Sequence, residues 1–293
     1  MSVSDSAPIR LHDDVALFRE ALTYTAAETG FIARLIEKDY FCTVLLQYLA
    51  ADRYGLVFRG GTSLAKVHAR FYRLSEDLDF VISTPGDASR AERRRRVGES
   101  KEGVAAMEEY LPGFRVSTAL TGANDSTQYN AVLGYTSVLG HQEEAIKIEV
   151  SLREPLLRPS IRGEAQTLLL DPISGSPLVP ALPIPCLSKV EAMAEKLRAA
   201  LSRREVAIRD FYDIDHAVRR LTLHVLEPDL VGLVKEKLAV PGNDPVDVSA
   251  ARLAALRPQL DAQLRSVLRA RDFADFDLER AFATVASVAA ALG

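Results

Sequence analysis

The sequence has little of what several classes of protein require. Its 293 residues include 2 cysteines, too few for a disulfide framework, and Cys42 and Cys186 are better explained as packed thiols than as metal ligands. No run approaches the roughly 18 apolar residues that cross a membrane. Residues 1–11 lack the basic and apolar regions of a signal peptide. We therefore expect a soluble, cytoplasmic protein that makes no contact with a membrane.

Positive charge is not in excess either. The chain has 36 Lys+Arg against 40 Asp+Glu and a formal net charge of −4, so any nucleic acid would have to be held by a local patch. The Walker pattern and the dinucleotide-binding glycine pattern are both missing from the sequence. The composition is otherwise that of an ordinary globular protein, with 48% hydrophobic and 26% charged residues and enough length for about two domains.

The hydrophobic pattern divides the chain into a mixed part and a helical part. Residues 16–51 place apolar side chains at helical intervals, which predicts an N-terminal helical cap. A charge-dense stretch at 88–110 predicts further helix. Strands are predicted at 56–59, 78–83, 114–120, 129–139 and 145–151. The last two alternate in polarity across a short connection at Gly140-His141, which is typical of antiparallel neighbours with one face toward water.

A proline-rich stretch marks the expected domain boundary. Five prolines between positions 172 and 185 predict a linker or wrapping loop without regular structure. Beyond it, Ser188-Lys189-Val190-Glu191 is a capping box that opens a helix. Helices are predicted at 188–201, 207–221, 227–237, 248–270 with a break near Pro258, and 278–292. We expect domains at 1–180 and 181–293 in an α+β fold, with a mixed or antiparallel sheet, flanking helices and a C-terminal helical domain.

The most informative stretch is Val57-Phe58-Arg59-Gly60-Gly61-Thr62-Ser63-Leu64. An apolar strand that ends in two glycines lets the backbone turn sharply. A helix that starts at Thr62 or Ser63 would then aim free N–H groups at an anion, with phosphate as the obvious candidate.

Three carboxylates form the second pattern. Asp77 and Asp79 alternate with apolar residues, so both carboxylates lie on one face of a strand. Like charges held side by side favour a divalent cation, and Mg²⁺ is commonly held by one or two carboxylates and by substrate phosphates. Glu149 can join them if its strand is a neighbour. Each pattern alone also fits a solvated strand surface, but the glycine turn upstream favours a metal site.

Together these motifs resemble the nucleotidyltransferase β superfamily, whose pattern is h-G-[GS] followed by D-h-[DE]-h and a later strand carboxylate. Within it, the chain is similar to the AbiEii/AbiGii branch, which includes the MenT-type toxins. The resemblance is carried by Glu37-Lys38-Asp39-Tyr40, Phe58-Arg59-Gly60-Gly61-Thr62-Ser63-Leu64, Arg73-Leu74-Ser75-Glu76-Asp77-Leu78-Asp79-Phe80, Ile148-Glu149-Val150-Ser151, Glu195-Lys196-Leu197-Arg198-Ala199 and Arg209-Asp210-Phe211-Tyr212-Asp213. The spacing from Gly61 to Asp77 is longer than the commonest one, which predicts an extended helix after the glycine turn.

The resemblance implies a nucleotidyltransferase-like fold and a role for each matching residue. The nucleoside triphosphate would be bound by Gly60, Gly61, Thr62, Ser63, Ser75 and Lys196. Catalysis would rest on Asp77, Asp79, Lys196 and Asp210, and Mg²⁺ or Mn²⁺ would be held by Asp77, Asp79 and Glu149. The C-terminal domain would thereby complete the active site.

The residues themselves leave some of these roles open. Lys196 lies beside the buried stripe of its helix and could equally be an exposed lysine in an i,i+4 ladder. Arg209, Asp210 and Asp213 could form a local salt-bridge set. Either Glu149 or Asp210 could orient or deprotonate the acceptor hydroxyl.

The expected acceptor is RNA. The resemblance implies a toxin that transfers NMP from an NTP to the 3′ end of tRNA, inhibits translation and is neutralised by a cognate antitoxin, in a type IV-like toxin-antitoxin or phage-abortive system. Arg93, Arg94, Arg95 and Arg96 belong to the densest basic run and are candidate RNA contacts, with a solvated helix face as the alternative. Two other functions stay open: nucleotidylation of a protein or small molecule, and a non-catalytic binding module.

Overall fold

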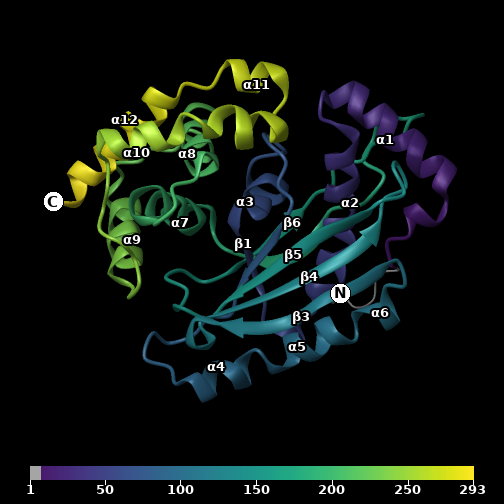
Figure 1. Ribbon diagram of the computed structural model, residues 1–293, viewed down its shortest axis with the longest axis horizontal. Helices are drawn as coiled ribbons and strands as arrows, with labels where there is room; N and C mark the ends of the chain where they lie inside the picture. The colour runs from purple at the N-terminus through teal and green to yellow at the C-terminus, as the bar shows by residue number, and fades with distance from the viewer. Residues whose placement is uncertain (1–7) are drawn as a thin grey trace. The chain divides into compact units, whose positions relative to one another are not determined.

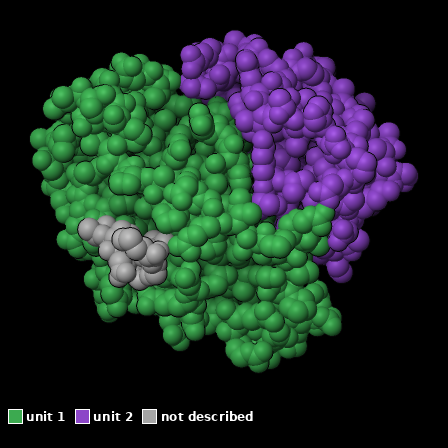
Figure 2. Space-filling model, turned by 180° about the vertical axis from the view of Figure 1, so that it is seen from behind, with its two compact units in different colours: residues 1–187 green, residues 188–293 purple. Residues whose placement is uncertain are grey.

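The computed structural model describes residues 8–293 and divides into two compact units. Unit 1 is Met1–Leu187 and unit 2 is Ser188–Gly293, coloured green and purple in Figure 2. The sequence predicted domains at 1–180 and 181–293, and the observed division lies after strand β7 (Leu182–Cys186). This strand is therefore part of unit 1.

Unit 1 is built on a mixed seven-stranded sheet with the strand order β3-β4-β5-β2-β1-β7-β6 (Figure 1). In chain order its strands are β1 (Val57–Arg59), β2 (Leu78–Val81), β3 (Phe114–Ala123), β4 (Gln128–Thr136), β5 (Glu143–Ser151), β6 (Ile161–Ala165) and β7. Its helices are α1 (Val15–Thr29), α2 (Ala33–Leu49), α3 (Gly60–Ser63), α4 (Arg90–Arg96), α5 (Gly98–Ala105) and α6 (Met107–Tyr110). The predicted α+β class with a mixed sheet and flanking helices is confirmed.

Period-two alternation gives this sheet one buried face and one open face. Ile146 and Ile148 of β5 are buried, whereas Lys147 between them is exposed. Helix α2 packs on the buried face, where the Phe41 ring stacks on Tyr135 of β4 with 4.0 Å between ring centroids. Figure 1 shows α2 behind the sheet. The side chains that alternate with the buried ones consequently stand on the face that α2 does not cover.

The predicted elements of the first half are confirmed with shifts at their ends. Strands β4 and β5 are antiparallel neighbours, as their alternation indicated. The N-terminal helical region is two helices, because Gly30 adopts φ +75° and ends α1. The charge-dense stretch at 88–110 is three short helices, α4, α5 and α6.

The prediction of an irregular linker over 172–185 is wrong for its last part. Pro183 and Pro185 lie in β7, an internal strand between β1 and β6. Alternate residues of a strand turn their N–H groups to opposite neighbours. The Leu187 N–H donates to the Phe58 carbonyl of β1 at 3.0 Å, so the missing N–H groups of both prolines lie on the β1 side. That side needs few hydrogen bonds because β1 has three residues.

Unit 2 consists of helices and the segments that connect them, and no strand is found in residues 188–293. Its helices are α7 (Lys189–Ser202), α8 (Ile208–Arg220), α9 (Pro228–Ala239), α10 (Ala250–Leu256), α11 (Ala270–Ala274) and α12 (Leu278–Leu292). Ser188 caps α7 as predicted, since its Oγ accepts from the Glu191 N–H at 3.4 Å. The predicted break near Pro258 is also present, because α10 ends at Leu256 and shorter turns follow. Within the described part of the chain, no helix has the length and apolarity to cross a membrane.

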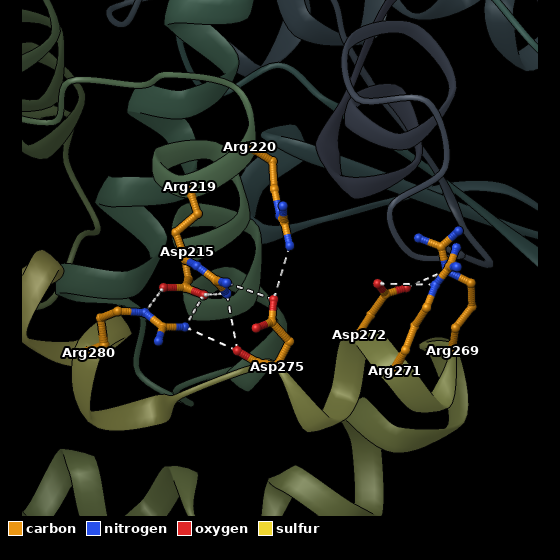
Figure 3. Close-up of polar contacts among 8 residues, drawn as sticks. All are labelled: Asp215, Arg219, Arg220, Arg269, Arg271, Asp272, Asp275 and Arg280. Carbon is orange, nitrogen blue, oxygen red and sulfur yellow. Dashed lines mark hydrogen bonds and ion pairs between the residues drawn. The ribbon is translucent and has the colours of Figure 1, made fainter.

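Arginines and aspartates join three helices of unit 2 (Figure 3). Arg280 of α12 donates to both carboxylate oxygens of Asp215 on α8, at 2.8 and 2.9 Å. Asp275, which follows α11, accepts from Arg219 at 2.7 Å and from Arg220 at 3.3 Å. Asp215 is buried, and a buried carboxylate is stable only when it is paired. The network therefore holds α12 and the end of α11 against α8.

Candidate active site

The two glycines form the turn that the sequence predicted. β1 ends at Arg59, and α3 begins at Gly60, two or three residues before the expected start. Gly60 has φ +76°, and a Cβ there would lie 2.3 Å from Asp79 Oδ2. Only glycine satisfies both the left-handed backbone and this close approach. The turn thus places the first residue of α3 directly against the Asp79 carboxylate.

The second glycine lies against a buried arginine. A Cβ on Gly61 would lie 2.3 Å from an Arg73 guanidinium nitrogen and 3.3 Å from Ser75 Oγ. Arg73 is 2% exposed, and its guanidinium donates to the Leu74 carbonyl at 3.1 Å. The structure therefore brings Gly60, Gly61 and Ser75, three predicted nucleotide-binding residues, into one small region with a cation behind it.

The two hydroxyl residues of the turn are directed inward. Thr62 is buried, and its Oγ1 donates to the Asp77 carbonyl. Ser63 is also buried, and its Oγ has no hydrogen-bond partner among the described residues. An anion at the turn would therefore be bound by backbone N–H groups and not by these hydroxyls, because the first N–H groups of a helix have no intrahelical acceptor.

The helical stretch that follows the glycine turn is short and ends at His68. α3 continues as a π-helical turn, Leu64–His68, and residues 69–77 then form an irregular segment. Arg70 and Phe71 in that segment have φ +49° and +56°, outside the helical region. The expectation of an extended helix is therefore wrong, because the additional residues between Gly61 and Asp77 belong to this segment.

Two of the predicted carboxylates, Asp79 and Glu149, lie side by side on the face of the sheet that α2 does not cover. β2 and β5 are parallel neighbours, and Asp79 pairs in register with Glu149. Leu78 and Phe80 are buried beneath, while Asp77, Asp79 and Glu149 are each partly exposed. Glu149 was expected to join the site only if its strand lies beside the strand of Asp77-Leu78-Asp79. This condition is met.

Arg59 is a neighbour that sequence reasoning did not assign. It is the last residue of β1 and pairs in register with Asp79 of β2, so its side chain is on the same face as that carboxylate. Its position directly before the glycines could have indicated a role, because a cation there would lie beside any phosphate that the turn binds.

The donor set fits a divalent ion that takes part of its coordination from a substrate. Asp79 and Glu149 supply hard carboxylate oxygens from adjacent strands, as Mg²⁺ prefers. Over residues 8–293, no three His, Cys, Asp or Glu side chains are gathered into a preformed metal cage. The set of three predicted from the sequence, Asp77, Asp79 and Glu149, is therefore not such a group among the described residues, and Asp79 and Glu149 are the two that the register places side by side.

The motif Glu37-Lys38-Asp39-Tyr40 on α2 joins α2 to four other parts of unit 1. Glu37 accepts from Ser137 Oγ and the Val138 N–H at 2.6 and 2.7 Å, in the β4–β5 turn. Lys38 pairs with Glu76 at 2.9 Å, directly before Asp77.

Asp39 and Tyr40 complete this set. Asp39 pairs with Lys66 at 2.7 Å, and the Tyr40 hydroxyl lies 2.8 Å from His12 Nδ1. All four side chains of the motif are buried, so they support the site from below. Because Lys66 and Arg73 are also buried, neither belongs to an RNA-binding surface.

The predicted lysine and aspartate of unit 2 lie together. Lys196 of α7 pairs with Asp210 and Asp213 of α8, at 2.8 Å in each case. Both aspartates are buried, so Lys196 is a partner of buried charges and not an exposed lysine in a helix ladder. Asp210 Oδ2 is buried and accepts no hydrogen bond among the described residues, with an Arg203 guanidinium nitrogen 3.6 Å away.

The arginines of the basic run point in different directions. Arg96 pairs with Glu92 at 2.6 Å and donates to the Ser83 carbonyl, and Arg93 donates to the Gly86 carbonyl. Arg94 and Arg95 are exposed and make no ion pair with a described residue. Of the four arginines predicted as RNA contacts, two hydrogen-bond to the protein itself and two point to solvent.

Both cysteines are buried free thiols. Burial raises the pKa of Cys42 to about 12 and that of Cys186 to about 11. They are packed residues, as the sequence indicated.

Comparison with known proteins gives one family. The family model described as nucleotidyl transferase AbiEii toxin, type IV toxin-antitoxin system, matches residues 44–288. The search of curated proteins found no match. Two solved structures from Helicobacter pylori are each 18% identical to this chain and cover 88% of it. One, provisionally described as a nucleotidyltransferase, has a TM-score of 0.43 over 90% of its own length; JHP933 has 0.45 over 88%.

Proposed function

Because the chain belongs to the AbiEii nucleotidyl transferase toxin family of type IV toxin-antitoxin systems, we propose that it transfers a nucleoside monophosphate from an NTP to the 3′-terminal hydroxyl of tRNA. The acceptor oxygen forms a bond to the α-phosphorus as the bond to the leaving pyrophosphate breaks. A tRNA whose 3′ end is blocked no longer serves translation, and a cognate antitoxin would restrain this toxicity.

The position of the Asp79 carboxylate carries the proposal. It lies against Gly60 at the start of α3 and opposite Glu149 on the neighbouring strand. A phosphate bound by the turn would therefore lie next to two carboxylates, which is an unfavourable arrangement without a cation. A Mg²⁺ ion held by Asp79 and Glu149, with Asp77 of the same face nearby, would neutralise phosphate charge there.

The remaining roles follow from the surroundings of each residue. The backbone of Gly60 and Gly61 holds the triphosphate, and Arg59 offsets charge on it from the adjacent strand. Of the two candidates for orienting the acceptor hydroxyl, Glu149 is partly exposed on the open face, whereas one oxygen of Asp210 is bound to Lys196. We therefore favour Glu149 for this role. The catalytic roles of Lys196 and Asp210 stay predictions.

The test is nucleotide transfer in vitro. The wild-type chain, each α-³²P-labelled NTP, Mg²⁺ and total tRNA are incubated together, and label is followed in RNA, protein and small molecules. Asp79→Asn is the test variant, and Asp87→Asn, an exposed aspartate elsewhere in unit 1, is its charge-matched control. We expect label in tRNA with the wild type and with Asp87→Asn, and about a thousandfold less with Asp79→Asn, because lost charge stabilisation costs several kcal/mol.

Other outcomes identify the other functions. Label in protein or in a small molecule would leave the chemistry standing and replace the acceptor. The absence of label with every NTP and acceptor would support a binding module. Toxicity is tested separately: induced expression in a bacterial host should stop growth with the wild type and Asp87→Asn but not with Asp79→Asn.

A further inference from the structure

A second basic feature of unit 1 lies where α4 and α5 meet the β3–β4 hairpin, and none of the three predicted carboxylates lines it. A cavity of about 400 Å³ is lined there by Arg90, Arg94, Lys101, Gly122, Ser126 and Tyr129. Helix α4 contacts the turn of that hairpin at Asn124–Ser126. Three of the six lining side chains are cations, and none is a carboxylate.

The three cations share the cavity without partners. Arg90, Arg94 and Lys101 are exposed, and none forms an ion pair with a described residue. Arg90 and Arg94 are four residues apart on α4, so they lie on one helix face and repel each other. In a chain with net charge −4, this gathering of unneutralised positive charge is a local exception. Its chemistry fits an anion with several charges.

The same helix shows which arginines are already used within the fold. Arg93 and Arg96 turn toward the protein and donate to the carbonyls of Gly86 and Ser83. Arg95 is exposed like Arg94 but does not line the cavity. The basic run is therefore divided by helix periodicity into residues that hold the fold, residues that face the cavity and one outward residue.

The lining chemistry favours phosphate over a nucleobase. Arginine and lysine donate to phosphate oxygens, and the hydroxyls of Ser126 and Tyr129 can do the same. Arginine and lysine can also bind guanine edges, but Asn, Gln, Asp and Glu, which read adenine and cytosine, are missing from the lining. The Tyr129 ring is 2% exposed and lies over Gly122, where a Cβ would be 3.0 Å from it, so it offers no open face for stacking.

We propose that this cavity binds backbone phosphates of the acceptor RNA, through Arg90, Arg94 and Lys101, independently of base sequence. This deepens the proposed function and rests on it, since it assigns the RNA a contact outside the carboxylate site. Binding of this kind weakens as salt rises, because each neutralised phosphate releases counterions.

Binding is measured separately from transfer. The probe is fluorescein-labelled total tRNA, followed by anisotropy with the full chain in the absence of NTP and Mg²⁺, over a series of KCl concentrations. Arg94→Glu is the test variant, and Arg95→Glu, one residue away on the same helix, is the matched control for charge and exposure. Thermal unfolding checks that each variant is folded.

We expect Arg94→Glu to weaken tRNA binding by roughly tenfold and to lower the slope of log affinity against log salt by about one contact. Lys101→Ala should act in the same direction and less strongly. Arg95→Glu should change affinity by less than about threefold. Poly(U) and poly(A) should lose affinity in the same proportion as tRNA.

Several results overturn the proposal. Equal losses with Arg94→Glu and Arg95→Glu would indicate a diffuse basic surface, and unchanged binding with Arg94→Glu would remove the cavity from RNA recognition. Calorimetry with inorganic phosphate is the second probe. Saturable phosphate binding that depends on Arg94, together with tRNA binding that does not, would assign the cavity to a free anion.

The two proposals fail in different ways. If tRNA binding depends on Arg94 but no NTP labels tRNA, the cavity stands and the proposed acceptor chemistry fails. If tRNA is labelled and Arg94→Glu leaves the KM for tRNA unchanged, the chemistry stands and the cavity fails.

Discussion

The carboxylates of the two units have opposite surroundings. In unit 1, Asp79 and Glu149 stand side by side and partly exposed on adjacent strands. In unit 2, Asp210 and Asp213 are buried, and the Lys196 ammonium lies 2.8 Å from each. The unit 2 carboxylates share one buried ammonium group, whereas the unit 1 carboxylates stand on a strand face that a cation from solution can reach. Carboxylates that the sequence groups into one function therefore differ in what they contribute to stability.

The largest expected effect is in unit 2. Lys196→Met should lower the free energy of unfolding by roughly 3 kcal/mol, because two buried carboxylates lose their shared cation. Urea denaturation measures this, with Lys235→Met on the exposed side of α9 as the control. Adding Asp210→Asn and Asp213→Asn should restore part of the loss. If Lys196→Met unfolds at the wild-type midpoint but lacks transfer activity, Lys196 serves the reaction alone, and the comparison breaks down.

The next effect is in unit 1 and should fall on activity. Gly60→Ala forces a side chain into a position with φ +76°, where the new Cβ would lie only 2.3 Å from Asp79 Oδ2, so the carboxylate has to move away. We expect transfer to fall by about a hundredfold, since a displacement of about 1 Å in a catalytic group costs that much.

Stability should fall by only about 1 kcal/mol in this variant. Gly86→Ala is the matched control, because nothing lies within 4 Å of a Cβ there. A Gly60→Ala protein with wild-type kcat would show that the close approach of the glycine to Asp79 is not needed for the reaction.

A smaller effect is expected at the Arg280 pair of Figure 3. Arg280→Ala removes two hydrogen bonds to Asp215, but the arginine is partly exposed and Arg219 stays 3.5 Å from the same carboxylate. We expect a loss of about 1 kcal/mol in unfolding free energy, reduced by solvent screening. A loss equal to that of Lys196→Met would mean that exposure does not separate the two ion-pair sets.

The last effect is a pH dependence that appears only below neutral pH. Burial lowers the pKa of His216 from 6.5 to about 4, with Asp213 opposing this effect and Arg220 reinforcing it. The folded protein therefore binds fewer protons at His216 than the unfolded chain does. Its contribution to stability is fully present above pH 6.5 and is lost as pH falls toward 4. Urea midpoints of the wild type and His216→Gln should converge over that interval, and parallel curves would contradict the prediction.

The sequence predicts correctly those elements whose geometry follows from the residues within them. The paired glycines allowed one backbone path, and the alternation of Asp77 and Asp79 with apolar residues fixed which side chains share a face. The adjacency of Asp79 and Glu149 was a conditional expectation, because strand order depends on contacts distant in sequence. The structure supplies that order.

The misses have physical reasons. Pro183 and Pro185 argued against a strand, and the local rule fails because both prolines face the short strand β1. Arg59 was not assigned a role because its position before the glycines does not show that it lies beside Asp79, which only the register of β1 and β2 does. The four arginines at 93–96 were taken as one group, although helix periodicity sends Arg93 and Arg96 back to the protein.

The buried ion pair of Lys66 bears on how far this protein can be shortened. The family match begins at residue 44, yet Asp39, the partner of Lys66, lies before it, as does Lys38, which holds Glu76 next to Asp77. A chain trimmed to the matched residues would retain the glycine turn and the carboxylates while burying an ammonium group without its counterion. Its failure to fold would therefore say nothing about the reaction, and the smallest version worth making starts before α2.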